Sequence, residues 1–352
     1  MTGQLPTADA TIKSLDAQIF ADLDLVDGGC RWWHGYQDWK RLALINDYLI
    51  QVSGTLSHTT VLMAHHINRY DERWTANAYN FRRQHSAGSP LQERTSTEEL
   101  RDLDIEVAVR GFFDAAAHTL DLVATLFVGV LGLKDNLRKV SWQTVCRAQK
   151  EAGQPGSKLL DGHGSPARAL QELTIRDCAN STPHDPDGWI KWTRDTRNTF
   201  LHRAQRIRLW AFTRIEGQEN AKEDLFHLLP AHPSLTDAEV LAQSKSIDNA
   251  FLMNHVSDLM RVVYGNITDL VSTHCRVLED VWIKRRNEPS LIVQPGQQWP
   301  KIEVLELPPF VGAAQKLKSL SGSVTFNPRD VDRWRALKVM DDEAGNSWGT
   351  HR

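Results

Sequence analysis

The sequence lacks the motifs of most familiar enzyme and membrane classes. It has no Gly-Lys-Ser/Thr loop for nucleotide phosphates, no Gly-x-Ser-x-Gly turn for a nucleophilic serine and no zinc-finger spacing. Its most apolar run, Leu122 to Leu133, is about a dozen residues long and follows Asp114, His118 and Asp121. A helix that crosses a bilayer needs roughly 20 apolar residues. We therefore expect a buried helix segment here and no membrane partner.

Cysteine is scarce, and its spacing excludes two further classes of protein. The four cysteines lie far apart in the sequence, without the close pairing of a zinc site, and we find no signal peptide. We expect reduced thiols in a cytoplasmic protein that carries no metal or other cofactor. They are Cys30, Cys146, Cys178 and Cys275.

The sequence has no large excess of charge of either sign, because the net charge is only −3. Any attraction to phosphate must therefore be local rather than a property of the whole surface. One stretch, Trp189 to Ile215, has such a local positive charge, since it contains seven basic residues and a single acidic residue, Asp195. This pattern is typical of a basic cleft. The basic residues are Lys191, Arg194, Arg197, Arg203, Arg206, Arg208 and Arg214.

The 352 residues are enough for a large helical bundle with appendages. Strand signals are scarce, and we predict an all-α protein, with long helices in an up-and-down bundle. We divide it into an N-terminal arm over 1–35, a helical bundle over 36–288 and a C-terminal extension over 289–352. Pro, Gly, Gln and Ser become frequent in that extension, so we expect it to be mostly irregular.

Apolar periodicity and helix-capping signals predict the individual helices. A short helix from Ile12 to Val26 should belong to a loosely attached arm. Capping boxes begin two helices, one at Ser96 with Glu99 and one at Thr236 with Glu239. The full set of expected helices is 12–26, 36–69, 96–131, 141–152, one from Ser165 and Pro166 onward, 189–215, one from Thr236, 247–286 and 329–338. Extended segments are expected at 224–234 and 302–307.

The predicted helix over 189–215 has two different faces. One stripe can pack against a core. A polar ladder falls roughly opposite it, in which each member is four residues from the next, and Arg197 lies on its flank. The polar residues therefore face water or a partner. The core stripe is Trp189, Thr193, Thr196, Phe200, Ala204, Ile207 and Ala211, and the ladder is Arg194, Asn198, His202 and Arg206.

The residue types of the ladder indicate phosphodiester chemistry. Arginine offers a planar fork of donors that suits phosphate oxygens. A neutral histidine exchanges a proton near neutral pH. Arg197 on the flank of the ladder forms the run Arg-Asn-x3-His with Asn198 and His202.

This run resembles the Arg-x(4 to 6)-His signature of the HEPN superfamily, helical bundles found in RNases, toxins and antiphage effectors. The resemblance implies a HEPN-like core over about 96–288 and a homodimer in which two motif helices line one cleft. It implies a metal-independent endoribonuclease with Arg197, Asn198 and His202 as catalytic residues. Arg194, Arg203 and Arg206 would hold the RNA. An antitoxin or regulatory protein is a further implied partner.

Three other interpretations of the same residues stay open. In the first, the protein is a non-catalytic HEPN-like dimer that binds RNA, nucleotide or a partner protein. In the second, the ladder is an ordinary solvated helix face. A dinuclear metal site would instead use Asp114, His118 and Asp121 with His255 and Asp258, although the usual Glu-x-x-His pattern is missing.

Arg110 lies in the apolar stripe of its own helix and needs a partner there. We expect Asp114, four residues on, to be that partner.

Overall fold

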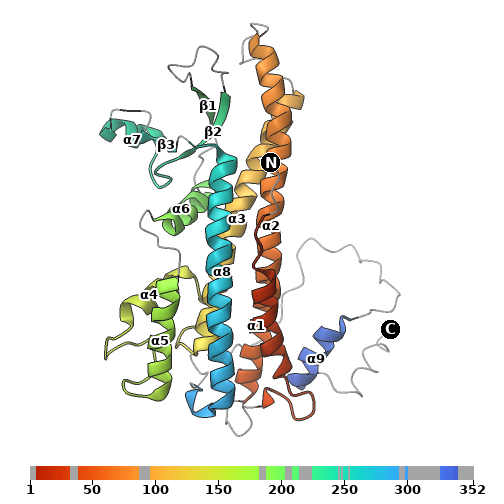
Figure 1. The fold of residues 1–352 in the computed structure, drawn as a ribbon, viewed down its shortest axis with the longest axis vertical. Helices are drawn as coiled ribbons and strands as arrows, with labels where there is room; N and C mark the ends of the chain where they lie inside the picture. The colour runs from red at the N-terminus through yellow and green to blue at the C-terminus, as the bar shows by residue number, and fades with distance from the viewer. Residues whose placement is uncertain are drawn as a thin grey trace, which may run out of the picture. The chain divides into compact units, whose positions relative to one another are not determined.

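The computed structural model describes most of the chain, and these parts are mostly helical (Figure 1), as predicted. They group into two compact units, which we call the first and the second unit and describe separately. The first unit comprises Met1–Ile12, Thr55–Val123 and Cys178–Cys275, and the second comprises Lys13–Gly54, Ala124–Asp177 and Arg276–Arg352. The described residues are 5–31, 39–86, 96–181, 188–202, 208–213, 224–244, 246, 249–252, 254–292, 298–299 and 326–339.

Three long helices, α2 (Trp39–Ser86), α3 (Ser96–Leu131) and α8 (Val256–Asn287), contribute residues to both units. Helix α3 has the predicted bounds, and Gly132 follows it with a φ of 67° that favours glycine. Its segment Glu99–Leu131 is long and apolar enough to cross a membrane, but 83% of its most apolar window is buried inside the protein. Length and composition therefore mark it as a core helix as readily as a span.

Two of the long helices differ from their predicted bounds. Helix α2 continues to Ser86, beyond the predicted end at residue 69. Helix α8 begins nine residues later than predicted, because Phe251 and Leu252 pair as strand β3 instead. His255 then precedes the helix, and its Nδ1 accepts a hydrogen bond from the Ser257 amide at 3.2 Å. The cap fixes the start of the helix, which periodicity alone did not reveal.

The first unit is built around contacts between α2 and α3. Thr119 donates to Thr59 through their hydroxyl groups at 3.0 Å in the buried interface. Nearer the exposed ends of the helices, Asp104 forms ion pairs with Arg69 and Arg73 at 3.3 and 3.2 Å. The shared core is apolar and includes Met63, Ile67, Tyr70, Phe112, Phe113, Ile267 and Leu270.

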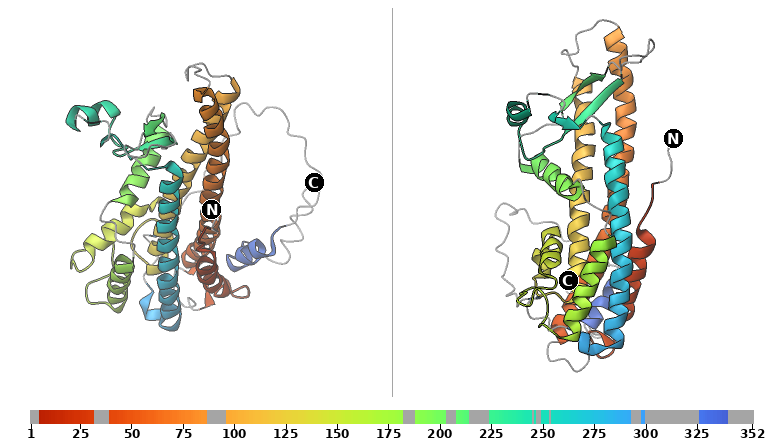
Figure 2. Two further views of the ribbon diagram at one scale, coloured as in Figure 1. Left: turned by 45° about the horizontal axis from the view of Figure 1, so that its top comes forward. Right: turned by 60° about the vertical axis from the view of Figure 1, so that its left-hand side comes forward.

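A small antiparallel sheet belongs to the same unit (Figure 2). Its order is β1-β2-β3, with β1 at Arg208–Thr213, β2 at Asp224–Pro230 and β3 at Phe251–Leu252. Leu209 pairs with His227, and the register shifts between Leu209 and Phe212. The extended segment expected at 224–234 is confirmed over β2, whereas β1 and β3 lie in segments that were predicted to be helical.

The predicted helix over 189–215 is wrong in its second half. Helix α6 ends at His202, and β1 follows at Arg208. The sequence Leu-Trp-Ala-Phe-Thr is rich in aromatic and β-branched residues, which suit a strand as well as a helix stripe. Pairing with β2 makes this segment a strand rather than a helix. The residues of β2 lie outside the stretch 189–215 whose periodicity predicted the helix.

Beyond β2, helix α7 spans Asp237–Ser244 and begins with the predicted capping box. The Thr236 amide donates to Glu239 at 2.7 Å, and the Glu239 amide donates to the Thr236 hydroxyl at 3.3 Å. The two residues therefore satisfy each other's exposed amides.

In the second unit the N-terminal segment is firmly packed, so its expected loose attachment is wrong. Helix α1 spans Asp9–Ala21, and its Leu15 and Ile19 are completely buried. After the helix, Asp22 accepts hydrogen bonds from Trp282 at 2.7 Å and Arg286 at 3.1 Å. These apolar and charged contacts tie the segment to α8.

The predicted short C-terminal helix is confirmed as α9, Pro328–Ala336. Arg333 of α9 forms a 2.7 Å ion pair with Asp47, and the Ala336 carbonyl accepts from the Gly29 amide at 2.6 Å. The strand expected at 302–307 lies outside the described residues. Short 3₁₀ turns occur at Leu137–Lys139 (η2) and Pro289–Leu291 (η4).

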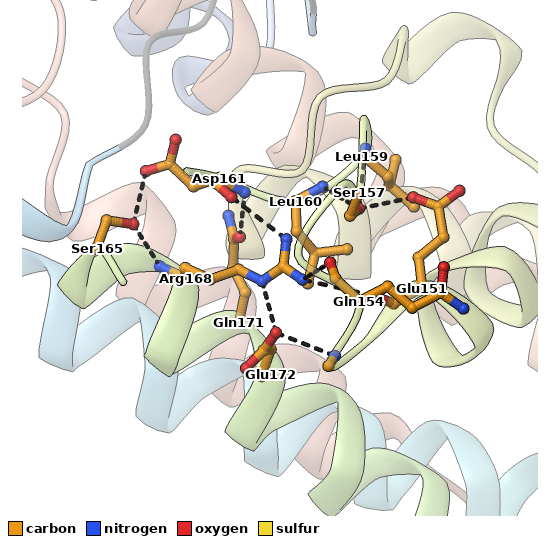
Figure 3. Close-up of polar contacts among 11 residues, drawn as sticks. Glu151, Gln154, Ser157, Leu159, Leu160, Asp161, Ser165, Arg168, Gln171 and Glu172 are labelled. Atoms are coloured by element: carbon orange, nitrogen blue, oxygen red, sulfur yellow. Dashed lines mark hydrogen bonds and ion pairs between the residues drawn. The ribbon is translucent and has the colours of Figure 1, made fainter. Parts of the chain in front are cut away.

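Helices α4 (Trp142–Glu151) and α5 (Pro166–Ser181) were both predicted, α5 from its cap, and Ser165 does accept from the Arg168 amide at 3.1 Å. The loop between them folds around the Arg168 guanidinium (Figure 3). Its Nε donates to Glu172 at 2.6 Å, Nη1 to the Asp161 carbonyl at 3.3 Å and Nη2 to the Gln154 carbonyl at 2.9 Å. The buried arginine therefore binds loop carbonyls that have no partner in regular secondary structure, and these bonds hold the loop.

Candidate functional site

Helix α6, Trp189–His202, carries the predicted motif and is fixed by its buried face. Thr193, Thr196 and Phe200 are buried as predicted, and Trp189 is half-buried. Phe200 packs against Phe113 of α3, with ring centroids 5.9 Å apart. Of the rest of the predicted stripe, Ala204 and Ile207 lie outside the described residues and Ala211 is in β1.

Two hydrogen bonds connect α6 to the chain around β2. The Trp192 indole donates to the Pro230 carbonyl at 3.1 Å, and the Thr199 hydroxyl donates to the Pro233 carbonyl. These two bonds and the buried Thr193, Thr196 and Phe200 fix one side of α6, while Asn198 is exposed.

Arg197 and Asn198 form a connected polar pair beside the buried side of α6. The Arg197 side chain is 36% exposed, and Asn198 is exposed. Arg197 donates from Nη1 to the Asn198 side-chain oxygen at 3.2 Å and from Nε to Asp114 of α3 at 3.2 Å. Among the described residues Arg197 Nη2 has no acceptor, so its N–H groups remain for a ligand.

The other predicted site residues are placed less completely. Arg194 is half-buried on α6. His202 is the last residue of α6, and its backbone position, four residues after Asn198, puts the two on one side of the helix. The imidazole of His202 lies outside the described side chains. Arg203 and Arg206 lie outside the described residues altogether.

The partner of Arg197 was missed, and the expected pair of Arg110 with Asp114 is wrong. Arg110 pairs with Glu106, four residues before it. Asp114 is thereby left for Arg197, 83 residues away in the sequence. No local pattern signals that contact, because it depends on how α6 packs against α3.

The alternative metal site gains no geometry from the structure. Within the described part of the chain, no three His, Cys, Asp or Glu side chains gather as metal ligands do. Asp114 is engaged by Arg197, and His118 is exposed on the next turn of α3.

A second polar cluster in the first unit is buried and structural. The Tyr70 hydroxyl lies 3.0 Å from His227 Nδ1, and Trp74 stacks near the same imidazole with centroids 4.5 Å apart. Tyr70 and His227 are 0% and 2% exposed, and burial raises the pKa of Tyr70. A substrate cannot reach these groups, so the cluster joins α2 to β2 rather than forming a site.

Comparison with protein-family models, with curated proteins and with solved structures finds no match to this chain. The resemblance to HEPN proteins therefore depends on the motif residues and stays a prediction.

Proposed function

We propose that the protein is a metal-independent endoribonuclease of HEPN type whose catalytic residues are Arg197, Asn198 and His202. One observation carries the proposal. Arg197 and Asn198 are joined by a hydrogen bond beside the buried side of α6, where Arg197 is partly exposed and Asn198 is exposed. This is the preorganisation that electrostatic catalysis needs, because the donors do not have to be reoriented when the substrate binds.

The reaction follows from RNA itself. The ribose 2′-hydroxyl attacks the adjacent phosphorus, the P–O5′ bond breaks, and the products are a 2′,3′-cyclic phosphate and a 5′-hydroxyl. His202 takes up or delivers a proton, Arg197 stabilises the additional negative charge in the transition state, and Asn198 orients Arg197 or the phosphate. No metal or organic cofactor is required, because the nucleophile is part of the substrate.

Binding and assembly are part of the same proposal. Arg194, Arg203 and Arg206 hold the RNA backbone, so binding weakens as salt concentration rises. Two copies of the chain associate about a two-fold axis and present both motifs to one cleft. By the same resemblance, the protein acts in the cytoplasm as a toxin or antiphage effector that an antitoxin or regulatory protein restrains.

The ion pair between Arg197 and Asp114 favours a second candidate, a non-catalytic dimer that binds RNA, nucleotide or a partner protein. A carboxylate on the guanidinium offsets part of its charge and competes with a phosphate for the same donors. Such a protein would bind RNA through the motif but release no product.

Cleavage assays in EDTA distinguish the two candidates. The wild-type protein should cleave RNA and spare DNA, and His202→Ala should lose at least about 100-fold in rate while it still binds. Lys191→Gln is a matched control on the same helix, because Lys191 is exposed and paired with Asp195. RNA binding without product from the wild-type protein supports the second candidate.

A further inference from the structure

Cleavage by the ribose 2′-hydroxyl involves two proton transfers. One proton leaves the attacking hydroxyl, and another reaches the departing 5′-oxygen. The predicted motif contains a single histidine, His202. In the proposed dimer the second proton-transfer group is either His202 of the partner subunit or a group of the same chain that lies beside Arg197 outside the motif.

His66 of α2 lies against α3 close to that place. Its imidazole is packed on Gly111 so tightly that a methyl group there would lie 2.5 Å from Nε2 and 2.9 Å from Nδ1. Such separations are too short for unbonded atoms, so a side chain at position 111 would displace the ring. Glycine at this position allows the imidazole to approach the α3 backbone.

Gly111 also relates His66 to the motif. It precedes Asp114 by three residues, and residues at this spacing lie on adjacent turns of a helix with about 5–6 Å between their Cβ positions. Asp114 in turn contacts Arg197 Nε at 3.2 Å. The imidazole and the guanidinium therefore lie near neighbouring turns of α3.

The surroundings of His66 favour its neutral form. Burial lowers the pKa of His66, the positive charges of His65 and Arg69 lower it further, and Asp114 acts weakly in the opposite direction. Its Nδ1 is buried and has no hydrogen-bond partner among the described residues, while the residue as a whole is half-exposed. A neutral imidazole that is partly open to solvent can accept a proton at neutral pH.

We propose that His66 is the general base of the reaction, an inference that rests on the proposed function. The neutral His66 imidazole takes the proton of the 2′-hydroxyl as the 2′-oxygen bonds to phosphorus. The P–O5′ bond breaks, and His202 in its protonated form gives its proton to the leaving 5′-oxygen. Product release returns the two histidines to their starting states by exchange of one proton with water.

His66→Gln tests this role, and His58→Gln is the matched control because His58 is exposed on α2 two turns earlier. We expect His66→Gln to lower the cleavage rate by about 100-fold or more with RNA affinity retained. The rate of the wild-type protein should rise with pH as His66 loses its proton, and this rise should disappear in His66→Gln. His58→Gln should keep both the rate and the pH profile.

A modified substrate separates the base from the acid. An RNA whose leaving 5′-oxygen is replaced by sulfur at the mapped cleavage site needs no acid, because a thiolate leaves unprotonated. This substrate should restore cleavage by His202→Ala to within about tenfold of wild type and should leave His66→Gln impaired. Gly111→Ala, which displaces the ring while its circular dichroism stays native, should be impaired in the same way as His66→Gln.

The possible failures can be told apart. If the wild-type protein cleaves and His202→Ala does not, but His66→Gln keeps the wild-type rate and pH profile, the assignment of His66 is wrong and the proposed function stands. Rescue of His66→Gln by the sulfur substrate would equally overturn its role as base. If the wild-type protein cleaves no RNA, both proposals fail together.

Discussion

Two arginines, one in each unit, show how differently the same side chain can be used. Arg168 is 2% exposed and donates to Glu172 and to backbone carbonyls. Arg197 is 36% exposed and donates to one carboxylate and one amide oxygen, neither of them a buried carbonyl. All three nitrogens of the Arg168 guanidinium donate within the fold. Of the Arg197 guanidinium, Nε and Nη1 donate, and Nη2 has no acceptor among the described residues.

The comparison shows why burial and partner type matter more than residue identity when a site is sought. A buried arginine must satisfy its donors internally, because an unpaired charge in the interior is costly. An exposed ion pair contributes little to stability, typically 0 to about 1 kcal/mol, so the contact of Arg197 with Asp114 is no adequate structural reason for an arginine there. Substitutions at the two positions should therefore separate stability from activity.

The largest expected effect is on activity, at Arg197. Arg197→Ala should lower RNA cleavage by about 10²- to 10³-fold, the usual cost of removing one donor to a charged transition state. Arg197→Lys should restore only part of the rate, because an ammonium group cannot donate through a planar fork. In both variants the free energy of unfolding should change by less than about 1 kcal/mol. Single-turnover cleavage and urea denaturation measure the two effects, and a large loss of stability would contradict the comparison.

The converse variant is Arg168→Met, which keeps the apolar part of the side chain. It should lower the free energy of unfolding by about 3 kcal/mol or more, since three partly buried hydrogen bonds from the charged guanidinium are lost at about 1–3 kcal/mol each. The loop between α4 and α5 should become protease-sensitive, and cleavage of RNA by the remaining folded protein should be normal. Urea denaturation with limited proteolysis checks this. If Arg168→Met were as stable as Arg197→Ala, the Arg168 network would contribute nothing.

A buried histidine, His274, extends the contrast to pH dependence. His274 is 0% exposed, its Nδ1 is 2.9 Å from the Leu270 carbonyl, and burial lowers its pKa from 6.5 to about 4. A folded-state pKa below the unfolded one means that the unfolded chain binds the proton first. Stability from this group is therefore intact above about pH 6.5 and is lost as the pH falls towards 4, by about 3 kcal/mol in all.

Urea denaturation at a series of pH values tests that sign. His274→Gln should flatten the stability curve between pH 6.5 and 4 relative to wild type. His58→Gln, at an exposed position, should leave the curve unchanged. An identical slope in wild type and His274→Gln would show that other groups cause the acid sensitivity.

The smallest effect is expected at Asp114. Asp114→Asn removes the carboxylate that competes with phosphate for Arg197, so RNA affinity at low salt should rise by no more than about fivefold, corresponding to about 1 kcal/mol. The gain should vanish at high salt and in the Arg197→Ala background. Weaker binding by Asp114→Asn would indicate that the ion pair positions Arg197 for RNA instead of competing with it.

Local signals in the sequence predicted the elements whose limits are set locally. Ser96 and Gly132 delimit α3, and Ser165 with Pro166 begins α5, because a cap or a glycine determines the backbone there whatever the rest of the fold does. The end of α6 was not predictable in this way. Residues 208–213 suit a helix stripe and a strand alike, and pairing with β2 decides between them.

The candidate site was predictable to a similar extent. The buried side of α6 and the accessible side chains of Arg197 and Asn198 follow from helical periodicity over a few turns. The contacts of Arg197 with Asp114 and of His66 with Gly111 join residues 83 and 45 positions apart. They depend on packing between helices, which a single sequence does not display.

The central claim is that the motif on α6 cleaves RNA through the ribose 2′-hydroxyl. The most direct test uses an RNA with a mapped cleavage site and a copy that carries one 2′-deoxyribose at that site, incubated in EDTA with wild-type protein and His202→Ala. The account predicts a 2′,3′-cyclic phosphate from the first RNA with wild-type protein, and no cleavage at the modified site. Cleavage of the deoxy-substituted site, or equal cleavage by His202→Ala, would contradict it.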